Sequence, residues 1–169
     1  ETYTDKEDTE IQDILMSWDE MPLVAMMVHA AGAAIVDTGC GRSVCGEETL
    51  LRHCEEKNLL DVQWVEDPQK MIFRYGNGLR DESIGQVMLP CHIQGTDFFV
   101  LLHIVKGGVP MLLSKKSVKH MGAIINLEQE YIKLRHIGPD GTTVKLIENK
   151  WGNYEIDLYD KKADAPPFR

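Results

Sequence analysis

The residues with the clearest chemical potential in this sequence are Asp37, Thr38 and Gly39, which directly follow the apolar residues 33–36. A carboxylate at the end of a buried strand is costly unless it is hydrogen-bonded, so it needs partners nearby. Thr38 supplies a hydroxyl and a backbone N–H, and Gly39 permits a turn that a Cβ atom would obstruct. Such a carboxylate could act as a general base toward water. The plainer interpretation is that Asp37 caps a turn at a strand end.

A single carboxylate of this kind is only half of a hydrolytic site. Hydrolysis of a peptide bond needs an activated water molecule and a proton for the departing nitrogen, and two adjacent carboxyl groups that share one proton supply both. The chain has a single Asp-Thr-Gly, because Asp140-Gly141-Thr142 has the wrong order. A hydrolase of this type would therefore be a homodimer, with the two Asp37 side chains on its two-fold axis.

The four cysteines offer other chemistries. Cys40, Cys45, Cys54 and His53 have the side chains of zinc ligands, but their spacing fits no usual structural zinc site. A Cys/His hydrolase built on Cys40 or Cys45 is a further alternative. We favour small buried apolar residues and expect no metal or other cofactor. The absence of a Cys-x-x-Cys pair or a dense disulfide framework predicts a reducing compartment, the cytoplasm.

Length and charge limit the remaining classes of function. A chain of 169 residues is long enough for one domain with its own core. It has 18 Lys and Arg against 27 Asp and Glu, and no basic cluster exceeds two residues, which argues against nucleic-acid binding. The longest apolar run, residues 23–28, is too short to cross a membrane. Because the sequence begins with Glu, we expect a processed piece of a longer chain.

The elements that must position Asp37 are predicted to be mostly strands. Two apolar runs, 23–29 and 33–37, predict a hairpin whose second arm carries Asp37. Helical spacing over 11–21 predicts a short amphipathic helix that packs on the core or binds a partner protein. Two more helices are predicted over 47–58 and 117–121. Further strands are predicted over 62–65, 71–75, 84–93, 98–105, 123–127, 131–136, 143–147 and 154–159, and a second apolar run over 110–114 ends at a small polar residue.

Three motifs, in this order, resemble those of retropepsins, the single-lobed aspartic proteases of retroviruses and retrotransposons. The first is Ile35-Val36-Asp37-Thr38-Gly39-Cys40 followed by Ser43-Val44. The second is Phe73-Arg74-Tyr75-Gly76-Asn77-Gly78, at the place of the family's flap hairpin. The third joins Met111-Leu112-Leu113-Ser114 to residues 118–127 and resembles the family's apolar pair, short helix and closing strand. The likeness covers about residues 24–134 and is greatest to proteases of Copia-type retrotransposons and their domesticated relatives.

The resemblance implies a mostly β fold, a closed acid-protease barrel with short helices and one lobe per chain. It implies an N-terminal extension with a short helix over 1–22, a protease domain over 23–136, a C-terminal β extension over 137–160 and a flexible tail over 161–169. The implied activity is that of an aspartic endopeptidase with catalytic Asp37, which processes a retrotransposon-type polyprotein or acts as a domesticated protease.

The resemblance also assigns roles around Asp37. Thr38 and Gly39 would form the active-site loop, with Thr38 joining the two loops across the axis and Gly39 allowing close approach of the substrate backbone. The flap would close over an extended polypeptide and exclude water, although an ordinary hairpin is the alternative. The flap residues would be Tyr75, Gly76, Asn77, Gly78 and Leu79. Apolar pocket walls would come from Ile35, Val44, Leu79, Ile84 and Leu112, for which core packing is the alternative.

Two departures from the family pattern are visible. Ser114 stands where the family usually has Gly, and Lys115 stands where Arg is common, so the salt bridge that steadies the family's dimer is not implied here. The segment after Leu134, which includes Trp151, has no counterpart in the smallest retropepsins. These departures favour an alternative function, a catalytically silent retropepsin-like module for dimerisation or peptide binding.

Overall fold

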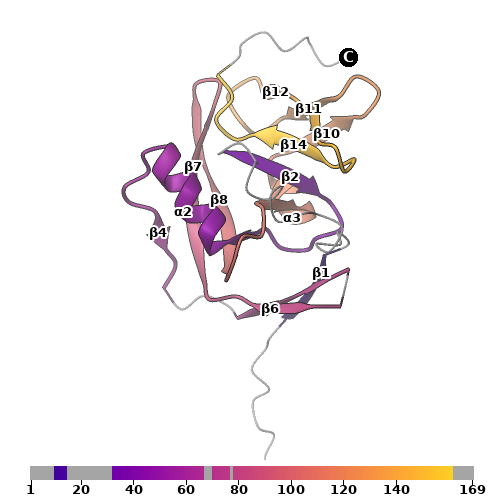
Figure 1. Cartoon of the computed structure of the whole chain (residues 1–169). Coiled ribbons are helices and arrows are strands. Elements are labelled where there is room, and N and C mark those ends of the chain that lie inside the picture. Colours follow the sequence, from indigo (N-terminus) through magenta and orange to yellow (C-terminus); the bar gives the residue numbers. More distant parts are fainter. Residues whose placement is uncertain (1–9, 15–31, 67–69, 77, 162–169) are drawn as a thin grey trace, which may run out of the picture.

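The computed structural model describes residues 10–14, 32–66, 70–76 and 78–161 (Figure 1). These residues form a mostly β fold with two short helices, α2 (Glu47–Glu56) and α3 (Lys115–His120), which confirms the predicted composition of the fold. The first arm of the predicted hairpin, residues 23–29, lies outside the described residues, whereas its second arm is a strand as predicted.

The largest sheet has eight strands in the order β13-β14-β2-β9-β3-β8-β7-β4. Their bounds are β13 Ile147–Glu148, β14 Tyr154–Asp157, β2 Ala33–Asp37, β9 Leu112–Ser114, β3 Val44–Gly46, β8 Thr96–Val105, β7 Gly85–Ile93 and β4 Gln63–Trp64. The closed barrel that we predicted is not found among the described residues. A barrel closes when its first and last strands pair, and here the two end strands, each of two residues, remain at opposite edges of an open sheet.

Two smaller sheets complete the fold. One has the order β1-β5-β6, with β1 Glu10–Ile14, β5 Met71–Tyr75 and β6 Arg80–Glu82. The other has the order β10-β11-β12, with β10 Ala123–Asn126, β11 Tyr131–Leu134 and β12 Thr142–Lys145. In Figure 1 the two sheets lie at opposite ends of the view, with β2 between them.

The helix predicted over 11–21 is wrong over residues 11–14, which belong to β1. The backbone of β1 pairs in parallel with β5, from Glu10 opposite Met71 to Ile14 opposite Tyr75. Pairing with a distant strand overrides the local helical spacing, because sheet preference depends mainly on the neighbours that a strand finds. The rest of the predicted helix lies outside the described part of the chain.

The buried apolar side chains form two clusters. The larger cluster contains the inward-facing side chains of β7 and β8, packed against residues of both helices and of β11, β12 and β14. The smaller cluster joins β2 and the loop after it to β5. It consists of Ile35, Cys40, Val44, Met71, Phe73, Tyr75, Val105, Val109 and Leu112. This smaller cluster holds the strand that carries Asp37 against the base of the β5–β6 hairpin.

Candidate active site

Asp37 is the last residue of β2, in the interior of the large sheet. β14 pairs with β2 on one side, and β9 pairs with it in parallel on the other side. The register places Asp37 opposite Ser114, the last residue of β9. The fold therefore brings the first and third sequence motifs side by side, at the carboxyl ends of two neighbouring parallel strands.

The two carboxylate oxygens of Asp37 have different surroundings. The backbone N–H of Gly39 donates to Oδ1 at 3.0 Å. Oδ2 is buried and has no hydrogen-bond partner among the described residues. Burial raises the pKa of Asp37 above its ordinary value, and hydrogen bonds from the backbone at Gly39 and Cys40 oppose this increase without cancelling it. Asp37 therefore retains a proton more readily than an ordinary aspartate, beside the exposed residues Thr38 and Gly39.

The predicted flap residues lie in the hairpin between β5 and β6. The N–H of Tyr75 donates to the carbonyl of Leu79 at 2.9 Å, and Gly78 adopts a φ of +85°, which glycine tolerates without strain. The buried Tyr75 hydroxyl donates to Asp81 Oδ2 at 2.8 Å, and burial raises the pKa of Tyr75. Gly76, Gly78 and Leu79 are exposed, whereas Asn77 lies outside the described residues. The hairpin thus has an anchored base and an open tip.

The predicted pocket walls separate into two groups. Ile35, Val44 and Leu112 are at most 1% exposed and belong to the smaller apolar cluster. Ile84 and Leu79 are 43% and 62% exposed. In the single chain the first group is core, and only Leu79 and Ile84 present apolar surface.

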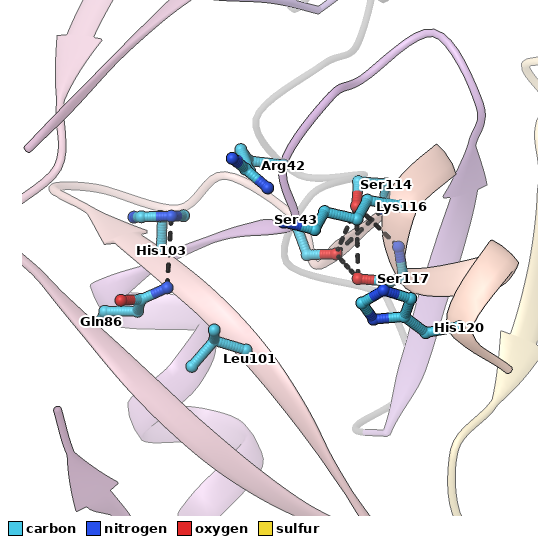
Figure 2. Close-up of a pocket in the computed structure, with 9 residues that line it drawn as sticks. All are labelled: Arg42, Ser43, Gln86, Leu101, His103, Ser114, Lys116, Ser117 and His120. Atoms are coloured by element: carbon cyan, nitrogen blue, oxygen red, sulfur yellow. Dashed lines mark hydrogen bonds between the residues drawn. The ribbon is translucent and has the colours of Figure 1, made fainter. Parts of the chain in front are cut away.

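Three serines form a cluster behind the Asp37 loop that the sequence analysis did not identify. Ser43 Oγ accepts from the backbone N–H of Ser114 at 2.9 Å, and Ser114 Oγ accepts from the N–H of Ser117 at 3.1 Å. The three hydroxyls also contact one another, at 2.5 to 3.2 Å (Figure 2). The sequence signal for this cluster was Ser114 itself, at a position where the family usually has glycine. Its side chain caps α3, which a glycine could not do in this way.

The cysteines do not assemble a second reactive centre. Burial raises the pKa of Cys40 to about 12, and it also raises the pKa of Cys45, whereas a nucleophilic cysteine needs a lowered pKa. Cys40 lies in the smaller apolar cluster and Cys45 in the larger one. His53 contacts the Tyr159 hydroxyl at 3.1 Å. Within the described ranges, no three His, Cys, Asp or Glu side chains are grouped to hold a metal ion.

Two wider observations complete the description of the site. Among the described residues, no helix has the length and apolar character needed to cross a membrane. Comparisons of the chain with models of protein families, with curated proteins and with solved structures each found no match.

Proposed function

We propose that this chain is a retropepsin-like aspartic endopeptidase that acts as a homodimer. The observation that carries the proposal is the Asp37 carboxyl group, with one oxygen held by Gly39 and the other buried without a partner among the described residues. Two copies of this group on the two-fold axis of a homodimer would share one proton. The β5–β6 hairpin, whose base packs with Cys40 in the smaller apolar cluster, supports the same proposal, as do the three motifs in the order of the retropepsins that they resemble. Each chain would then be one lobe of an acid-protease barrel.

The chemistry follows from a proton shared by the two Asp37 side chains. The ionised carboxylate takes a proton from water while the water oxygen bonds to the scissile carbonyl carbon, and the protonated carboxyl gives its proton to the carbonyl oxygen. The resulting tetrahedral diol collapses. Its C–N bond breaks as the nitrogen takes a proton from one carboxyl, and a diol hydroxyl returns a proton to the other. The burial that raises the pKa of Asp37 favours a pair of carboxyl groups with one proton, which these reaction steps require.

Support for a homodimer comes from β10, an edge strand of its sheet. Its neighbouring residues Ile124 and Ile125 are 40% and 36% exposed, and Leu127 just beyond it is also exposed. Successive residues of a strand point to opposite faces, so neither face of β10 is fully covered in the single chain. An exposed apolar edge strand is a liability unless it is paired. We propose that the β10 edge contributes to the contact between the two copies.

The substrate would be a polypeptide bound in extended form under the hairpin, where main-chain hydrogen bonds give affinity. A retrotransposon-type polyprotein or a host protein is the proposed source, with processing in the cytoplasm. No nucleic acid, membrane or cofactor takes part in the proposed reaction.

Cleavage of a peptide panel by the Asp37→Asn variant tests the proposal. The variant cannot supply the ionised carboxylate, so we expect cleavage to fall by about 10²-fold or more while the fold is kept. Asp140→Asn, an exposed aspartate that also precedes a glycine, is the matched control and should cleave like the wild type. Undiminished cleavage by Asp37→Asn would refute the assignment. Peptide binding without any cleavage by the wild type would favour the silent module, which the burial of Ile35, Val44 and Leu112 in the core also favours.

A further inference from the structure

A cavity of about 260 Å³ opens beside α3 and next to the serine cluster (Figure 2). Its lining includes three nitrogen-bearing side chains that can donate to an anion, those of Arg42, Lys116 and His120, whereas His103 Nε2, also in the lining, accepts from the side-chain amide of Gln86 at 3.3 Å. No aspartate or glutamate lines it, although the chain as a whole carries 27 acidic residues against 18 Lys and Arg. The cavity therefore has a positive lining in an acidic protein.

The serine cluster adds a hydroxyl donor to this lining. The hydroxyl of Ser43 donates to Ser114 Oγ at 3.2 Å, and that of Ser114 donates to Ser117 Oγ at 3.2 Å. Each hydroxyl carries one proton, so these two donations leave the proton of Ser117. The Ser117 hydroxyl can donate this proton to Ser43 Oγ, 2.5 Å away, or to a group bound in the cavity. Ser43 and Ser114 are buried, whereas Ser117 is half-buried, and all three line the cavity.

We propose that this cavity is a binding site for an oxyanion, a carboxylate or a phosphate group. The guanidinium of Arg42 suits the paired oxygens of such a group, Lys116 adds a second positive charge, and the Ser117 hydroxyl donates a hydrogen bond. A water molecule occupies about 30 Å³ in the liquid, so the cavity has room for the anion together with part of the group that carries it.

The site adjoins the Asp37 loop but is distinct from the proposed catalytic group. Arg42 and Ser43 follow that loop in the chain, and Ser114, which lines the cavity, pairs with Asp37 across β9 and β2. Anion binding requires no turnover, so the inference holds or fails independently of the proteolytic function.

Titration of the full chain at constant ionic strength, followed by NMR or calorimetry, tests the site. The probes are inorganic phosphate and a pair of short peptides that differ only by glutamate or glutamine. We expect the dissociation constant of phosphate or of the glutamate peptide to increase at least tenfold in Arg42→Gln/Lys116→Gln, and to increase in Ser117→Ala. Lys119→Gln removes one positive charge, as Lys116→Gln alone does, from an exposed position on α3 outside the cavity, and it should bind like the wild type.

The outcomes separate clearly. Binding of phosphate alone supports a free-ion site, and preference for the glutamate peptide over its glutamine partner supports a site for an acidic side chain. The proposal is overturned if neither probe binds, or if the double variant and Lys119→Gln bind as the wild type does. Thermal melting checks that each variant is folded. Should the double variant not fold, the single change at the exposed Lys116 gives the same comparison.

Discussion

Asp37 shows how one residue can link stability to protonation. Because its pKa is raised by burial, the folded chain binds this proton more tightly than the unfolded chain does. The stabilising contribution of the protonated group is complete below the ordinary pKa of 3.8 and is lost as the pH rises through the raised value. A carboxylate with one buried oxygen that has no partner among the described residues is thus tolerated at a cost that an inert turn residue would not impose.

The Asp37→Asn variant should reveal this cost. Asparagine keeps an oxygen that can accept from the Gly39 N–H, but it carries no charge at any pH. We expect the variant to melt at a higher temperature than the wild type at pH 7, with the difference disappearing near pH 3. Melting curves at several pH values check this, and a difference that is the same throughout the range would contradict it.

His53 has the opposite dependence on pH. Its side chain is 2% exposed, and burial lowers its pKa from 6.5 to about 4. The stability that comes from its neutral form is full above about pH 6.5 and is lost as the pH falls toward 4. We expect His53→Gln to lose less of its own stability over this interval than the wild type does. Chemical denaturation at pH 7 and pH 4.5 measures the difference, and the exposed His136→Gln should behave like the wild type.

At the scale of the elements, Ser114 connects β9, α3 and the loop after Asp37. Its hydroxyl accepts from the Ser117 N–H as the cap of α3, and its backbone N–H donates to Ser43 Oγ. We expect Ser114→Ala to lower the free energy of unfolding by about 1 to 2 kcal/mol, since the cap is lost and buried hydroxyls lose a partner. Urea denaturation measures this change, and an unchanged midpoint would contradict the assigned role.

The elements that the sequence predicted are those with a local pattern. The apolar run into Asp37, the strand Met71–Tyr75 and the helices predicted over 47–58 and 117–121 follow from local sequence patterns. The structure confirms them, with the helices at Glu47–Glu56 and Lys115–His120. β6 was missed because the letters Arg-Asp-Glu carry no strand pattern, and this segment is a strand only through its pairing with β5. β1 was missed for the same reason, because it is a strand only through its pairing with β5.

Part of the candidate site could likewise be predicted from local sequence, and part of it could not. Asp37 and its turn could be predicted because all of their chemistry is local in the chain. The serine cluster could not, since Ser43 and Ser114 meet only when β9 pairs with β2 and β3. The pocket walls could not be resolved either, because an apolar residue next to a site has the same letters whether it faces the core or a substrate.

On the scale of the whole molecule, assembly is the property that the proposed function requires. We expect Ile125→Asp, on the β10 edge, to weaken the homodimer at least tenfold and to reduce cleavage in parallel, because a charge would lie in the apolar contact. Analytical ultracentrifugation over a range of concentrations measures the equilibrium. Ile147→Asp, on the short edge strand β13, is the control and should leave it unchanged. Dissociation by the control alone would place the interface elsewhere.

The place of β14 beside β2 has a consequence for how the protein is made. The strand that ends in Asp37 is synthesised before one of its two neighbours, Tyr154–Asp157, which emerges from the ribosome more than a hundred residues later. Until then, the Ala33–Asp37 strand has an open edge and the main sheet is incomplete. Under the proposed function, a nascent chain would therefore stay inactive until its translation had passed Asp157. A protease inside a polyprotein would in this way be kept from cutting its own unfinished precursor.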